Sequence, residues 1–164
     1  MRYFTYPEKE YEEYSHIYLE LDREGYCLRA IYEGPRMLTT TNFVTENNWE
    51  LLPEGAIENP EDVMATVSAA LFETKWQAAL ALYREQWKTV KSIFQPEQKV
   101  TATVNVFYPQ GVILNIPGTA FHGLADYEMC KERWGTAKMY PYHTAELVIE
   151  GYDEKNMWIL LRPL

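Results

Sequence analysis

The stretch Lys99 to Asp126, KVTATVNVFYPQGVILNIPGTAFHGLAD, constrains the fold more than any other part of this sequence. Apolar and polar residues alternate along VTATVNV, and a second short apolar segment, VILNI, follows the turn sequence YPQG. Alternation with a period of two residues is typical of strands that bury one face, and proline and glycine favour the turns between them. The stretch therefore predicts three short strands in quick succession.

The first part of the chain shows a similar pattern. SHIYLEL (15–21), YCLRAIY (26–32) and MLTTTNFV (37–44) are separated by the turn sequences DREG and EGP. Three strands joined by short turns predict an antiparallel meander. The acidic residues 1–13 are expected to be a loosely attached start, and residues 45–60 are expected to form a loop.

A long amphipathic helix is predicted between Ser68 and Phe94. Large apolar residues recur there at steps of three and four: Phe72, Trp76, Leu80, Tyr83, Trp87, Val90 and Phe94. This spacing places them on one stripe of a helix of about seven turns. Pro96 is expected to end the helix. The stripe is expected to pack on the meander, because a small sheet is marginally stable without packing, and the barrel that follows is an alternative partner.

The net charge of −9 bears on the kind of partner. Through Gln95 the chain has nine Lys and Arg against 16 Asp and Glu, which gives −7 of that total. Nucleic-acid binding draws affinity from cations that neutralise phosphates, whereas an acidic field attracts basic partners. Charge alone therefore favours a basic protein partner.

The remaining composition indicates a soluble, cytoplasmic, non-enzymatic protein. Cys27 and Cys130 lie far apart and are expected to be two buried, reduced thiols. No phosphate-binding loop, nucleophile motif or metal-binding motif is present, so no cofactor, metal or catalytic residue is expected. The N-terminus is too polar for a signal peptide, and no apolar run is long enough to span a membrane. His122, Asp126 and Glu128 lie close in sequence, but polar residues at a strand end explain them better than a metal or acid–base site does.

From Lys99 to Leu161 the sequence resembles the S-one-type RNA-binding domain, a small OB-fold barrel. The matching pieces are VTATVNVFYPQG, VILNI, HGLADYE, TAELVIEGYD and NMWILL, in that order. The resemblance implies a five-stranded antiparallel barrel with a short helix, YEMCKERWG, between its third and fourth strands. It also implies binding of single-stranded RNA across the second and third strands.

The family's contact positions fall on residues of mixed character. Its two aromatic positions near the first turn correspond to Gln110 and Ile113, and its His and Ser positions correspond to Asp126 and Glu128. Neighbouring aromatic residues could replace the lost stacking platforms, and Tyr108 is expected to be exposed at its turn. The candidate contact face comprises Tyr108, Gln110, Ile113, Phe121, His122 and Asp126, with Lys99, Lys131, Arg133 and Lys138 as a basic rim.

The segment YLELDREGYCLRAIYEG (18–34) faintly resembles small bacterial proteins, some of them suspected toxin-immunity proteins. This resemblance implies an interaction module but identifies no functional residues.

These observations predict an α+β protein. Residues 1–95 would form an antiparallel meander packed on one long helix, and residues 96–164 would form the OB barrel. The first functional hypothesis is non-enzymatic binding of single-stranded RNA. The alternative is an acidic protein-interaction module, of immunity or adaptor type, that binds a basic protein.

Overall fold

A computed structural model describes residues 1–7, 14–34, 38–40, 52–53 and 55–164. Residues 38–40 are described by their backbone alone, and the other ranges with their side chains. The described chain divides into two compact units, one running up to Arg84 and the other beginning at Glu85. We call them the sheet unit and the barrel unit. The division falls before the boundary expected at residues 95 and 96, and the assignment of independent domains stays a prediction.

The sheet unit contains an antiparallel sheet of five strands in the order β4-β3-β2-β1-β5. The expected meander is confirmed as β2 (His16–Leu21), β3 (Cys27–Glu33) and β4 (Leu38–Thr40), with residues 37 and 41–44 of its third strand outside the described residues. Two further strands, β1 (Arg2–Pro7) and β5 (Ala65–Thr66), extend it. The expectation of a loose start is therefore wrong for residues 2–7, where Phe4 is buried in the core.

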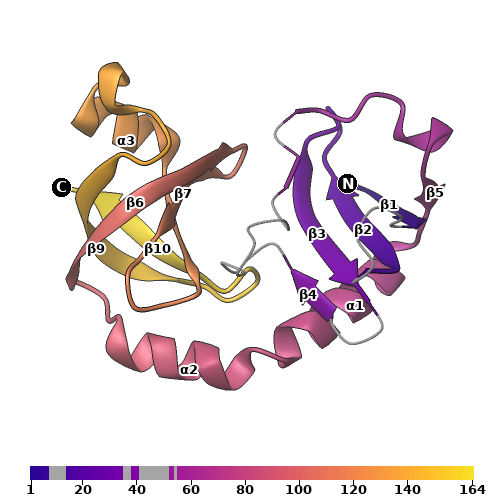
Figure 1. Cartoon of the computed structure of the whole chain (residues 1–164), viewed down its shortest axis with the longest axis horizontal. Coiled ribbons are helices and arrows are strands. Elements are labelled where there is room, and N and C mark those ends of the chain that lie inside the picture. The colour runs from indigo at the N-terminus through magenta and orange to yellow at the C-terminus, as the bar shows by residue number, and fades with distance from the viewer. Residues whose placement is uncertain (8–13, 35–37, 41–51, 54) are drawn as a thin grey trace. The chain divides into compact units, whose positions relative to one another are not determined.

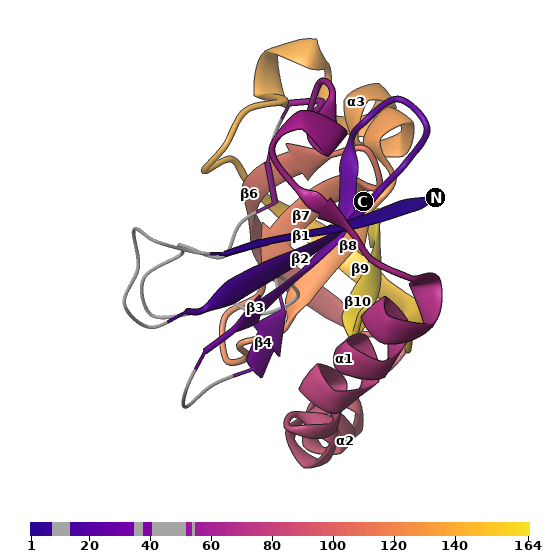
Figure 2. The same cartoon turned by 90° about the vertical axis from the view of Figure 1, so that its right-hand side faces the viewer.

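Helix α1 (Ala69–Ala81) covers one face of this sheet and contacts β1, β2, β3 and β4 (Figures 1 and 2). Its side chains Phe72, Trp76, Ala79 and Leu80 are buried, as the apolar stripe predicts. The hydroxyl of Ser68 accepts a hydrogen bond from the backbone N–H of Leu71, so this residue caps the start of the helix.

A buried arginine ties α1 to the sheet. Arg29 on β3 pairs with Glu20 on β2 and with Glu73 on α1, and its side chain is only 3% exposed. Its guanidinium also lies 4.9 Å from the ring centroid of Phe72 and 4.8 Å from that of Trp76. Burial lowers the pKa of Arg29, but the hydrogen bonds to Glu20 and Glu73 outweigh burial and raise it. The charge is therefore retained in the core because its partners are fixed there.

The single long helix predicted from Ser68 to Phe94 is wrong. The chain forms α1 and a second helix, α2 (Arg84–Ile93), interrupted at Leu82 and Tyr83. The N–H groups of these two residues bond to carbonyls three residues earlier, at 3.2 and 3.1 Å, which is the tighter pattern common at helix ends. The apolar stripe continues across the interruption, but α1 packs within the sheet unit and Trp87 of α2 is buried within the barrel unit.

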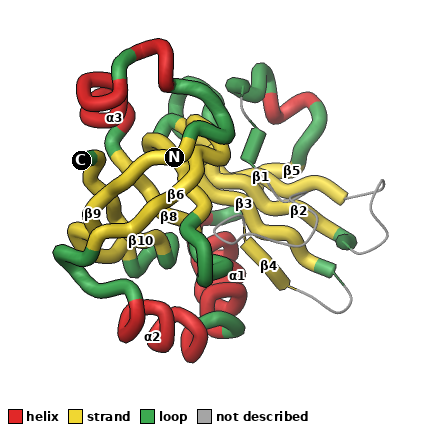
Figure 3. The backbone as a smooth tube through the Cα atoms, turned by 60° about the vertical axis from the view of Figure 1, so that its left-hand side comes forward, coloured by secondary structure: helices red, strands yellow, loops and turns green. Residues whose placement is uncertain are grey.

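The barrel unit contains a closed five-stranded barrel with the strand order β10-β8-β7-β6-β9 (Figure 3). Its strands are β6 (Lys99–Tyr108), β7 (Gly111–Asn115), β8 (His122–Ala125), β9 (Thr144–Asp153) and β10 (Trp158–Pro163). A barrel of this kind is compatible with an OB fold. It is not antiparallel throughout, because β10 runs parallel to β8. The connection between those strands includes a helix and a further strand, which permits the parallel pairing.

The two ends of the barrel are covered by helices (Figures 1 and 3). At one end α2 places Trp87 5.0 Å from the ring of Phe121 and 5.8 Å from that of Tyr152. At the other end lies α3 (Tyr127–Trp134), the helix predicted between the third and fourth strands, which contacts β7 and β10. The carboxylate of Asp126 caps its start by accepting a hydrogen bond of 2.8 Å from the N–H of Met129.

Cys27 and Cys130 are both free and buried, as the sequence predicts. Burial raises the pKa of each thiol to about 12, with a smaller contribution from Glu20 at Cys27 and from Asp126 at Cys130. None of the helices in the described ranges has the length and apolar character needed to cross a membrane.

Candidate nucleic-acid interface

Four of the six predicted contact residues lie in the core of the barrel unit. Tyr108 is 8% exposed, and Ile113, Phe121 and His122 are each 2% exposed. The expectation that Tyr108 is exposed is therefore wrong. It continues the buried phase of β6, in which every second residue from Ala102 onward points inward, and the turn begins only after it.

The other two predicted residues reach solvent but have different surroundings. Gln110 lies in the turn between β6 and β7 and is partly exposed. Asp126 is exposed, and its carboxylate holds the start of α3. The structure therefore does not bring the six residues together on one accessible face, and their role in binding stays a prediction.

A different group of aromatic residues is accessible in the barrel unit. It lies in residues 134–143, WGTAKMYPYH, which we call the aromatic connection because they link α3 to β9. The His143 ring packs against two others, with its centroid 5.3 Å from that of Trp134 and 5.6 Å from that of Tyr140. Tyr140 is 50% exposed and Tyr142 is 84% exposed. Two tyrosine rings therefore face solvent around a packed histidine.

The backbone holds Tyr142 in an unusual conformation. Its φ of 73° lies in the left-handed region, which is rare for a bulky residue. Its N–H donates to the carbonyl of Val104 over 2.8 Å, and the N–H of Val104 donates to the carbonyl of His143 over 2.8 Å. This pair of bonds anchors the connection to β6. Strain of this kind persists where the surrounding structure fixes it, and it is often found at functional positions.

Three cations lie within or just before the aromatic connection in the sequence. Lys131 and Arg133 lie on the last turns of α3, and Lys138 lies within the connection; all three are exposed. The connection itself contains no acidic residue, although the whole chain carries −9. Glu128 and Glu132 on α3 offset part of this charge, and Glu128 lies 3.8 Å from Lys131. This part of the sequence is thus less acidic than the rest of the chain.

Sequence reasoning identified the three cations but not the tyrosines. The sequence YPYH (140–143) lies just before TAELVIEGYD, the segment that matches the fourth strand of the barrel. Its signal is the presence of two tyrosines around a proline, outside any alternating pattern that would bury them. Aromatic residues at positions with no predicted burial are candidates for contact with a ligand.

Comparison with known proteins gives little further guidance. No protein family and no curated protein matches the sequence. Among solved structures, the chain is similar to a multidomain protein with nucleic acid binding domains from Streptococcus pneumoniae TIGR4, at 12% identity and a TM-score of 0.30. The match covers 89% of this chain and 48% of that one, so the chain spans about half the length of that protein. At this TM-score the likeness carries no argument about fold or function, and the S-one resemblance stays a prediction.

Proposed function

We propose that this protein binds single-stranded nucleic acid, RNA in particular, without catalysing a reaction, and that the aromatic connection is the contact surface. The observation that carries the proposal is the exposure of Tyr140 and Tyr142, with three exposed cations, Lys131, Arg133 and Lys138, close to them in the sequence. Proteins that bind single strands combine aromatic platforms for the bases with cations for the phosphates. We propose RNA rather than DNA because the sequence of the barrel resembles an RNA-binding domain.

The geometry of the aromatic connection supports stacking. A base can lie against any exposed ring face, so stacking tolerates sequence and contributes about 1–3 kcal/mol per base. Tyr142 presents nearly its whole side chain, and its backbone is fixed to β6, so little freedom is lost when a base contacts it. The His143 ring packs against Tyr140 and against Trp134, which limits the movement of Tyr140.

The location differs from the one that the resemblance implies. That family binds RNA across its second and third strands, which correspond here to β7 and β8. Ile113 and His122 on these strands are each only 2% exposed. We therefore place the contact on the connection between α3 and β9.

The direct test is fluorescence anisotropy of a labelled oligouridylate of about 16 nucleotides, the upper site size of an OB fold. We expect saturable binding at low salt that weakens as salt rises, because phosphate contacts release counterions. Tyr142→Ala and Tyr140→Ala should each weaken binding by about 1–3 kcal/mol. Tyr26→Ala, on the sheet unit, is the matched control and should bind like the natural protein. Absence of saturable binding at low salt, or full affinity in the double tyrosine variant, would contradict the proposal.

A second candidate function is binding of a basic protein through the first part of the chain, residues 1–95, which includes the sheet unit. The observation that favours it is the charge of −7 carried by residues 1–95, from nine cationic and 16 anionic residues. A labelled oligolysine probe tests it. Binding that weakens when exposed acids such as Glu61 and Asp62 are changed to Lys would support it, and binding indifferent to those changes would count against it.

A further inference from the structure

A groove lies between helix α3 and the end of strand β10, next to the aromatic connection. It has a volume of about 380 Å³. Its lining residues are Met129, Glu132 and Arg133 from α3, with Arg162 and Pro163 from β10. Arg133 and Trp134 are consecutive residues at the end of α3, so the groove and the aromatic connection begin at the same place.

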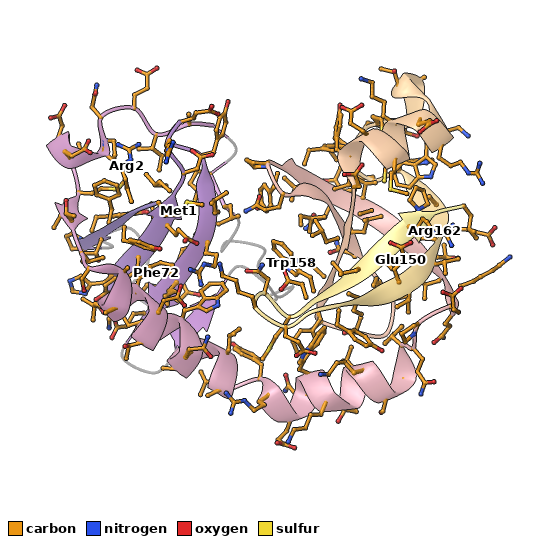
Figure 4. The ribbon with its side chains drawn as sticks, turned by 180° about the vertical axis from the view of Figure 1, so that it is seen from behind. Met1, Arg2, Phe72, Glu150, Trp158 and Arg162 are labelled. Atoms are coloured by element: carbon orange, nitrogen blue, oxygen red, sulfur yellow. The ribbon has the colours of Figure 1, made fainter. Side chains whose placement is uncertain are left out.

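Two guanidinium groups line this groove. Arg162 donates through Nε to Glu150 over 2.9 Å, and the two side chains lie on neighbouring strands (Figure 4). This bond uses one of the five N–H donors that a guanidinium carries. Arg133 is exposed, and within the described residues it makes no hydrogen bond or ion pair. Both arginines therefore retain donors for an anionic group.

We infer that this groove holds a backbone phosphate of the bound single strand, an inference that rests on the proposed function. Arginine suits the task because its planar fork matches the geometry of two phosphate oxygens. Met129 and Pro163 supply an apolar wall against which the sugar can pack.

The acidic residue in the groove limits how the ligand can lie. Glu132 would repel a phosphate placed beside it, so the phosphate lies toward the two arginines. The carboxylate can instead accept a hydrogen bond from a sugar hydroxyl or a base amino group. The groove thus suits a phosphodiester with its attached sugar better than it suits an isolated inorganic anion.

The experiment measures how oligouridylate binding depends on salt in Arg133→Gln, Arg162→Gln and the matched control Arg84→Gln. Arg84 is exposed at the start of α2 and has the same charge, but it does not line the groove. For single strands, each phosphate contact adds about 0.7 to the slope of log K against log salt. Each groove variant should lower that slope by about 0.7 and weaken binding about tenfold at low salt, while Arg84→Gln changes neither.

Two further variants separate the effect of the charge from the effect of the guanidinium geometry. Arg133→Lys and Arg162→Lys keep the charge but lose the fork, so they should keep the slope of the natural protein while binding more weakly. If the natural protein binds and the tyrosine variants weaken it, but the groove variants keep the natural slope, the groove inference is overturned and the proposed function stands. If the natural protein shows no binding at low salt, both are overturned.

Discussion

Replacement of Tyr142 by glycine and by alanine tests the backbone strain and the stacking role of this residue together. At a φ of 73°, an L-residue carries a steric cost of about 1–2 kcal/mol that glycine does not. Glycine loses about 0.4–1 kcal/mol through the greater freedom of the unfolded chain. We therefore expect Tyr142→Gly to be more stable than Tyr142→Ala by about 0.5–1 kcal/mol, the reverse of the order seen inside helices and strands.

The lost ring should affect stability little. Tyr142 is 84% exposed, so only about a sixth of a tyrosine surface of roughly 150–250 Å² is buried, worth about 0.6–1 kcal/mol. Relief of strain offsets this loss in the glycine variant, so its free energy of unfolding should stay within about 1 kcal/mol of the natural value. Both variants lack the ring, so each should lose about 1–3 kcal/mol of binding free energy, and the two losses should be equal.

Urea unfolding and anisotropy provide the two measurements. Glu97 is the matched control, because it is also exposed, non-glycine and left-handed, at a φ of 68°. Glu97→Gly should likewise be more stable than Glu97→Ala, but neither should weaken binding. If Tyr142→Ala equals or exceeds Tyr142→Gly in stability, the reasoning about backbone strain is refuted. If both variants bind as well as the natural protein, Tyr142 is not a stacking platform.

Three further predictions concern stability. Arg29→Met should lower the free energy of unfolding by about 3–5 kcal/mol, because it leaves Glu20 buried without its cation. Adding Glu20→Leu should recover much of this loss, and urea unfolding measures both effects. Gly111→Ala should lower the thermal midpoint sharply, because the new Cβ would lie 2.5 Å from a backbone oxygen at a φ of 141°. Burial raises the pKa of Glu154, but hydrogen bonds from Lys91 and Trp87 outweigh burial and lower it. The charged Glu154 therefore stabilises the protein at neutral pH, and this contribution is lost as pH falls below the ordinary glutamate pKa of about 4. Glu154→Gln should make the free energy of unfolding depend less on pH in the acid range.

The barrel strands could be predicted because their pattern is local. In β6 the alternation of Ala102, Val104 and Val106 with polar residues matches the burial in the structure. The parallel pairing of β10 with β8 has no such signal, because strand direction depends on the path of the intervening chain rather than on residue types.

The interruption at Leu82 and Tyr83 could not be predicted for a related reason. The sequence there contains neither glycine nor proline, and the apolar stripe remains in phase on both sides. What changes is the surface against which each helix packs, and this is tertiary information. Strand β1 had a local signal in RYFTYP, but the acidic residues after it dominated the interpretation.

The candidate site was the least predictable part. The sequence predicts Tyr108 at a turn, but this residue is the last in β6 and belongs to its buried phase. Because burial alternates along a strand, an error of one position in the end of the strand reverses the predicted exposure. Tyr142 was overlooked because loop residues carry no periodic signal, and only the structure shows that its backbone is fixed to β6.

The placement of β1 sets the order in which the two units can fold during synthesis. This strand is made before its neighbour β5 and before the α1 residue Glu73, which pairs with Arg29; both are about 60–70 residues further along. The sheet unit therefore cannot complete its core until α1 has been made. Strands β1 to β4 can pair with one another before then, but the face of the sheet that α1 covers stays exposed. The barrel strands follow one another closely, so the barrel can close as soon as β10 emerges. Slowing translation between β3 and α1 should thus prolong the exposure of the apolar strands of the sheet unit and leave the barrel unaffected.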